Sequence, residues 1–236
     1  MSIRKTPLVE KEFYHVFNRG NSKQEIFLDD KDYEHFIKLL YLCNSEKRIN
    51  FREDIVLKKI DVWDFERGVQ LVSIGAWVLM SNHFHIYITS SPNPWGLGKQ
   101  NNITVFIGRV CNAYTKYFNK KYNRTGSLFE GPFKSVHISD EIQAKYLFSY
   151  IHLNPLKLID KNWKTDGVKD KKGSLKYLES YKWGSFTDYM GTNRNESKIL
   201  NRDQFLDYFP SSGDFKKEIF DWISPKETPW AEVGIF

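Results

Sequence analysis

Two histidines stand two positions apart in the segment LMSNHFHIYITS, residues 79–90. Side chains at positions i and i+2 of a β-strand lie on the same face, so we expect His83 and His85 side by side and Phe84 on the opposite face. Two neutral imidazoles held in this way can bind one divalent cation, with a third polar group arriving from elsewhere in the fold. Two half-buried histidines bonded to backbone groups would give the same short pattern, so a metal site and a structural pair both stay open.

A second set of polar side chains lies in KYLFSYIHLNP, residues 145–155. Tyr150 and Asn154 are four positions apart and Tyr146 lies one turn earlier, so all three share one face of a helix. A tyrosine beside a metal held by two histidines and an asparagine would be positioned to attack a phosphodiester, because the metal withdraws charge from the phosphate. The product would be a covalent phosphotyrosine that conserves the bond energy for rejoining. The alternative is that the tyrosine is a packing residue of an amphipathic helix.

These side chains need a sheet and a helix to bring them together, and the hydrophobic pattern predicts both kinds of element. Strands are predicted where β-branched and aromatic residues concentrate: 11–21, 69–80, 83–89 and 132–139. The first of these ends at a predicted turn, Arg19-Gly20-Asn21. Helices are predicted where apolar residues recur at helical spacing: 29–48, 102–122 and 140–158. Asp29 or Asp30 and Asp140 are candidate N-caps, and Asn154-Pro155 marks the end of the last helix. The order strand, helix, strand, strand, helix, strand, helix indicates an α+β fold with helices packed on an antiparallel sheet.

Composition narrows the class of protein. Hydrophobic residues make up 41% of the 236 positions, enough for a packed core. Lysine and arginine outnumber aspartate and glutamate by 35 to 29, and this surplus modestly favours a polyanionic partner. No apolar run approaches the ~20 residues needed to span a bilayer, so no membrane partner is expected. Cys43 and Cys111 form no metal or redox spacing, which indicates a reducing, cytoplasmic setting.

Several segments together resemble the single-tyrosine HUH transposases. VLMSNHFHIYI is similar to the His-hydrophobe-His segment of that family. Three further blocks occur in the order that the family shows: FNRGNSKQEIFLDDKDYEHFIKLL, GSLFEGPFKSVHI and YLFSYIHLNPLKL. YKWGSFTDYMG resembles the C-terminal block of the REP-associated tyrosine transposase branch, and the blocks together are spread over residues 13–191.

This resemblance implies a fold and an activity. The fold is a ferredoxin-like α+β catalytic domain with an antiparallel sheet over residues 1–160, followed by a C-terminal extension over residues 161–236. Residues 45–70 are longer than the family leads us to expect and are interpreted as an insertion. The implied activity is cleavage and rejoining of single-stranded, hairpin-associated DNA through a 5′-phosphotyrosine, as in DNA transposition, with Mg²⁺ or Mn²⁺ as cofactor.

The resemblance also assigns residues to roles. His83 and His85 match the metal-binding pair of the family, and Asn154 falls where the third polar ligand lies on the nucleophile helix. Tyr150 matches the nucleophile. Tyr146 lies one turn before the family's position and is kept as the fallback nucleophile, with packing as its expected role.

Contacts with single-stranded DNA require cations for phosphates and polar or aromatic groups for bases. The candidates lie in the first predicted turn and around the basic segment 119–134: Asn18, Arg19, Lys120, Lys121, Arg124 and Lys134. Each taken singly has the alternative of a solvated surface residue. Lys134 is the strongest candidate, because its strand leads directly into the nucleophile helix. Phe129 and Glu130 stand where many relatives have Trp-Gln, so no role is assigned to that dipeptide.

Two other functions fit the same residues. One is a domesticated, non-catalytic protein that binds hairpin DNA and regulates without cutting it. The other is an unrelated metallohydrolase that uses His83 and His85 without covalent catalysis. Monomer and homodimer both stay open, and a dimer could place Tyr150 in its own site or in that of its partner.

Overall fold

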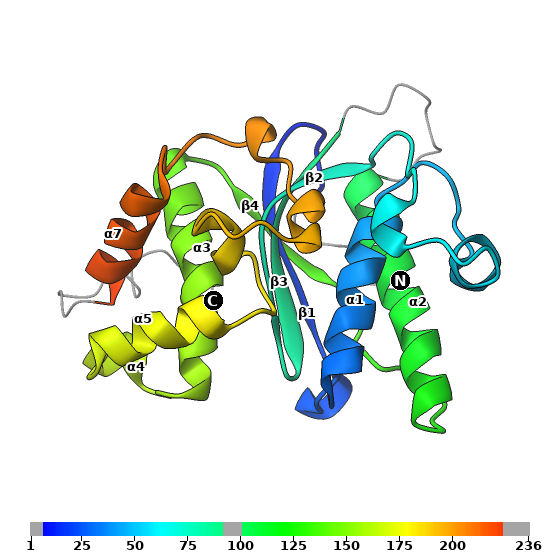
Figure 1. Ribbon diagram of the computed structural model, residues 1–236, viewed down its shortest axis with the longest axis horizontal. Helices are drawn as coiled ribbons and strands as arrows, with labels where there is room; N and C mark the ends of the chain where they lie inside the picture. Colours follow the sequence, from blue (N-terminus) through cyan, green and yellow to red (C-terminus); the bar gives the residue numbers. More distant parts are fainter. Residues whose placement is uncertain (1–6, 92–100, 224–236) are drawn as a thin grey trace.

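A four-stranded antiparallel sheet lies at the centre of the computed structural model, which describes residues 7–91 and 101–223 (Figure 1). Its strands are β1 (Phe13–Arg19), β2 (Val72–Met80), β3 (His83–Ser90) and β4 (Lys134–Ile138), in the spatial order β2-β3-β1-β4. The helix α1 (Asp30–Leu42) connects β1 to β2, and α2 (Asn102–Lys121) connects β3 to β4. This connectivity and strand order define the ferredoxin-like topology. The predicted α+β fold is confirmed.

Helices cover both faces of the sheet. In Figure 1, α1 and α2 lie on one face and α3 (Glu141–Leu153) lies on the other. Every residue of β2 is therefore buried, as is all of β3 after its first residue. Phe84 and Ile86 belong to the core under α1 and α2, whereas Met80 and Tyr87 belong to the core under α3. The sheet thus separates two apolar layers, which explains why its central strands read as nearly continuous apolar runs.

The ends of α3 follow from local chemistry. Asp140 caps the helix, because its Oδ1 accepts a hydrogen bond from the Gln143 backbone N–H at 2.8 Å. The α-helix stops at Leu153, because Pro155 has no N–H to donate to a further turn. Asn154 still has helical dihedral angles and opens a 3₁₀ turn. The four-residue spacing from Tyr150 to Asn154 is therefore helical, as the sequence predicts.

The segment after residue 160 packs against β2 and α3. The Leu79 N–H donates to Trp183 O at 2.8 Å, and Val78 forms an antiparallel bridge with Gly184. Its helices are α4 (Trp163–Asp166), α5 (Lys171–Ser180), α6 (Phe186–Tyr189) and α7 (Ser212–Trp222). Side chains of all four belong to the core under α3. A domain boundary at residue 160 stays a prediction, and residues 224–236 of the predicted extension lie outside the described ranges.

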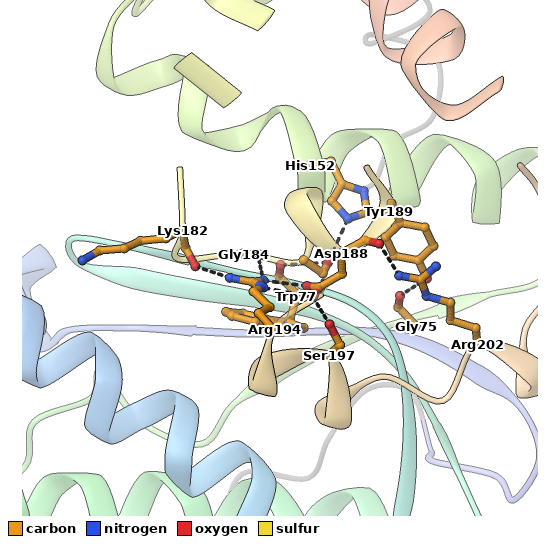
Figure 2. A network of polar contacts seen from close by, with 11 residues as sticks. Gly75, Trp77, His152, Lys182, Gly184, Asp188, Tyr189, Arg194, Ser197 and Arg202 are labelled. Atoms are coloured by element: carbon orange, nitrogen blue, oxygen red, sulfur yellow. Dashed lines mark hydrogen bonds and ion pairs between the residues drawn. The ribbon is translucent and has the colours of Figure 1, made fainter. Parts of the chain in front are cut away.

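Buried polar contacts join this segment to both β2 and α3 (Figure 2). Ser185 Oγ accepts a hydrogen bond from the Trp77 N–H at 3.0 Å and lies 2.8 Å from Nε2 of His152 on α3. The fully buried Asp188 carboxylate pairs with Arg194 at 2.6 Å. Removing one partner of a buried ion pair leaves an uncompensated charge, so loss of either side chain would destabilise this part of the chain. The segment therefore fixes α3 against β2.

Residues 45–70, interpreted as an insertion, contribute to the other core. They contain a single π-helical stretch, Phe51–Val56, and a 3₁₀ turn, Val62–Asp64. Ile55, Val62 and Trp63 are buried beside α1. None of the helices in the described ranges has the length and apolar character that crossing a bilayer requires.

Candidate active site

His83 and His85 lie side by side on the face of the sheet that α3 covers. Their ring centroids are 4.9 Å apart, and Phe84 between them is fully buried in the opposite core. Burial lowers the pKa of His83 to about 4 and holds that of His85 well below its ordinary value. Both imidazoles are therefore neutral at pH 7, which is the form that binds a metal ion.

Each of these imidazoles has its Nδ1 atom engaged by a neighbouring side chain. Nδ1 of His83 donates to Oδ1 of Asn82, 2.5 Å away. Nδ1 of His85 lies 2.8 Å from Nε2 of His15, a fully buried residue of β1. Histidines that bind metals generally have their other ring nitrogen bonded in this way, which fixes the tautomer and the ring orientation. In each ring this leaves Nε2 as the nitrogen that a cation could meet.

His15 is the residue of this group to which the sequence analysis assigned no role. Burial lowers the pKa of His15 to about 3, so its ring is neutral and its Nε2 can accept the Nδ1 proton of His85. The two rings are also stacked, with centroids 5.0 Å apart. The contact could not be predicted from a single histidine in an apolar strand, because the neighbours of that histidine depend on which strand pairs with its own. We interpret His15 as a positioning residue for His85.

Replacing His15 with phenylalanine is expected to weaken Mn²⁺ binding about 10- to 100-fold, the usual effect of losing a hydrogen bond to a metal ligand. Phenylalanine fills the same space but cannot accept the proton of His85. Titration of Mn²⁺ by electron paramagnetic resonance measures the change, and His15→Gln, which retains an acceptor, should recover part of it. The matched control is His35→Phe on α1, where a half-buried histidine is stacked on Tyr117. Unchanged Mn²⁺ affinity in His15→Phe would contradict this role.

The helix α3 places the predicted nucleophile over the histidine pair. The ring of Tyr150 meets that of His85 edge-on, with centroids 5.4 Å apart. Burial raises the pKa of Tyr150 to about 12, and the Asn154 side chain acts in the opposite direction. Asn154 also raises the pKa of His83 against the larger lowering effect of burial. The structure thus brings two imidazoles, one amide and one phenol to the same place between β3 and α3.

The donor set suits a divalent cation. Asn154 is fully buried, yet its Oδ1 and Nδ2 atoms reach no hydrogen-bond partner with ordinary geometry in the described part of the chain. A buried amide in that condition is expected to meet an ion or a water molecule. Two imidazoles and an amide oxygen suit Mn²⁺ better than Mg²⁺, which prefers oxygen ligands. Within residues 7–91 and 101–223 no three His, Cys, Asp or Glu side chains gather as a metal site. A cation here would therefore depend on His83, His85 and Asn154.

Tyr146, the fallback nucleophile, lies between two other aromatic rings. It is parallel to Tyr150, with centroids 6.5 Å apart, and meets Trp222 of α7 edge-on at 5.7 Å. Burial raises the pKa of its phenol above the ordinary value. Its surroundings are those of the packing residue that the sequence analysis expects.

Some of the side chains predicted to contact DNA near the end of α2 already interact with other residues of this chain. Lys121 pairs with Asp29 and with the fully buried Asp32, both at 2.7 Å, and so joins α2 to α1. The main role of this lysine is structural, because the two aspartates largely compensate its charge. Lys120 is exposed, and the half-buried Arg124 lies over the ring of Phe118 at 5.5 Å.

The two candidates in the first turn also make contacts within the chain. Asn18 is buried, and its Nδ2 donates to Gly131 O at 3.0 Å, so it shapes the loop before β4. Arg19 lies opposite His83 in the strand register and binds both carboxylate oxygens of Glu130, at 2.5 and 2.8 Å. That ion pair is exposed to solvent, where a phosphate can compete for the guanidinium.

Lys134 lies on the same face of the sheet as the histidine pair. It is exposed at the start of β4 and pairs with Phe17 of β1, which in turn pairs with His85 of β3. Register partners share a face and adjacent strands are about 4.8 Å apart, so Lys134 starts roughly 10 Å from His85. Lys134 therefore combines exposure with a place beside the site, as Arg19 does.

Comparisons with known proteins add a likeness to a solved structure. No family model matches the sequence, and no curated protein matches it. The chain is similar to a solved structure described as "Structure of the REP associates tyrosine transposase bound to a REP hairpin", with a TM-score of 0.49 and 13% sequence identity. The similarity covers 83% of this chain and 90% of that chain. At this score and identity the likeness carries no argument about function, which therefore depends on the side chains described above.

Proposed function

We propose that the protein is a metal-dependent, single-strand DNA nickase and strand transferase of the transposase type, acting on hairpin-associated DNA. The observation that supports this most is the convergence of Tyr150 and Asn154 from α3 with His83 and His85 from β3. The order of the sequence blocks that resemble the single-tyrosine HUH transposases supports it independently.

In the proposed reaction the phenol oxygen of Tyr150 attacks a backbone phosphorus atom. A bond forms between that oxygen and phosphorus, and the bond from phosphorus to the 3′-oxygen breaks. The departing 3′-oxygen takes up the proton that the phenol gives up. A divalent cation held by His83, His85 and Asn154 would withdraw charge from the non-bridging oxygens and orient the scissile phosphate. One phosphodiester is exchanged for another, so a 3′-hydroxyl can reverse the step and rejoin a strand.

End-labelled substrates test this proposal. A pool of single-stranded oligonucleotides, each with a hairpin and a randomised flank, is incubated with the protein and Mn²⁺ and resolved on a denaturing gel. A 5′-phosphotyrosine keeps the downstream fragment, so 3′-label should move with the protein while 5′-label is released on a shorter strand.

The two alternative functions predict different band patterns on these gels. A metallohydrolase without covalent catalysis would release both fragments and leave no label on the protein. A non-catalytic hairpin binder would retard the DNA on a native gel and produce neither fragment on the denaturing one. Either result would overturn the proposed function.

A further inference from the structure

A lysine from beyond the predicted catalytic domain stands over the candidate nucleophile. Nζ of Lys164 lies 4.1 Å from the centroid of the Tyr150 ring. The preceding residue, Trp163, is almost fully buried in the core under α3. Packing of that indole holds α4 in place, so Lys164 is positioned by the fold and its stem is only partly exposed.

A second lysine, Lys157, affects the pKa values of the residues around Tyr150. Lys157 is exposed, three residues after Asn154. Burial is the main cause of the low pKa values of His83 and His85, and the charge of Lys157 lowers both further. Lys157 acts on Lys164 in the same direction. The two lysines and the two histidines therefore lie within electrostatic reach of one another.

We propose that Lys164 binds the non-bridging oxygens of the phosphodiester that Tyr150 attacks. This inference rests on the proposed function, since it assigns a substrate contact to the same site. It makes Lys164 a catalytic residue that the segment after residue 160 contributes.

The cost of burying this cation supports the assignment. Desolvation lowers the pKa of Lys164 to about 7, so burial disfavours its charged form, and an anion bound beside it would favour that form. A phosphate anion would compensate that charge with charge-assisted hydrogen bonds. The ammonium also meets the face of the Tyr150 ring, a contact that keeps the phenol oriented while its oxygen attacks.

The first test uses inorganic phosphate without metal, so it does not depend on catalysis. Lysine side chains are labelled with ¹³C at Cε, and the Lys164 signal is identified by its loss in Lys164→Met. We expect this signal to shift and saturate as phosphate is added, while the signal of the exposed Lys161 does not. If the chemical shift of the Lys164 signal does not change when phosphate is added, the proposal is overturned.

The second test compares adduct formation in single turnovers. Lys164→Met keeps the aliphatic stem and should slow the reaction about 100- to 1,000-fold, as loss of one oxyanion-stabilising donor does. Lys164→Arg, which keeps the charge, should recover most of the rate, and Lys161→Met should match the wild type. Mn²⁺ affinity should not fall in Lys164→Met, because no metal ligand is removed.

The two tests separate this inference from the function on which it rests. If the wild type forms no adduct on any substrate of the pool, the proposed function fails, and the phosphate titration still decides whether Lys164 binds phosphate. If the wild type forms adducts and Lys164→Met forms them at the same rate, the role of Lys164 is wrong and the proposed function stands.

Discussion

Replacing Tyr150 with phenylalanine is expected to abolish the covalent DNA adduct, by at least about 10⁴-fold, as removal of a nucleophile does in other enzymes with covalent intermediates. The substitution removes one oxygen atom and keeps the ring. The contacts of that ring with His85 and Lys164 are therefore retained. The fold and the affinity for DNA should be nearly unchanged. The 3′-labelled adduct measures the first effect, and fluorescence anisotropy of labelled DNA measures the second.

The same substitution one turn earlier is the matched control. Tyr146→Phe removes a phenol oxygen from the same face of α3 and leaves the packing against Trp222 in place. It should form adducts at nearly the wild-type rate. Adducts that persist in Tyr150→Phe and disappear in Tyr146→Phe would show that the nucleophile has been misassigned.

Replacing His83 with alanine should weaken Mn²⁺ binding by more than about 100-fold, because one of two imidazole ligands is lost and loss of an outer hydrogen bond alone costs 10- to 100-fold. His83 is the better target of the pair, since it is half-exposed and lies at the start of β3. His85, in contrast, is buried against His15, so its removal would also disturb the sheet. Adduct formation at fixed Mn²⁺ should fall in parallel, and excess Mn²⁺ should restore part of it.

The control for this experiment is His137→Ala. His137 lies on β4 and pairs with Glu12 at 2.7 Å. Its register partner is Tyr14, which faces away from α3. Loss of His137 should leave Mn²⁺ binding unchanged. Equal Mn²⁺ affinity in His83→Ala and His137→Ala would mean that the metal ligands are wrongly chosen.

Much of the site could be predicted because its signals are local. Alternation in β3 places two histidines on one face, and four-residue spacing in α3 places Tyr150 and Asn154 together. Asp140 and Pro155 bound the helix by the chemistry of capping and of the missing N–H. None of these inferences requires knowledge of a distant part of the chain.

The residues that sequence reasoning missed depend on distant pairing. His15 reaches His85 only because β1 pairs with β3, seventy positions away. Lys164 lies in a four-residue helix whose short length gives no periodic signal. Distant pairing also limits the prediction of DNA contacts. The sequence shows the charge of Lys121 but not its pairing with Asp32, 89 positions away.

Backbone hydrogen bonds between residues 183–185 and β2 have a practical consequence for anyone who wishes to transplant the proposed activity. A fragment that stopped at residue 160 would leave a row of backbone groups on β2 open to other chains, a common route to aggregation. It would also separate Lys164 from Tyr150. Chimeras should therefore exchange residues 7–223 as one block, and libraries that seek new target sequences should vary exposed positions such as Lys134 and Lys120.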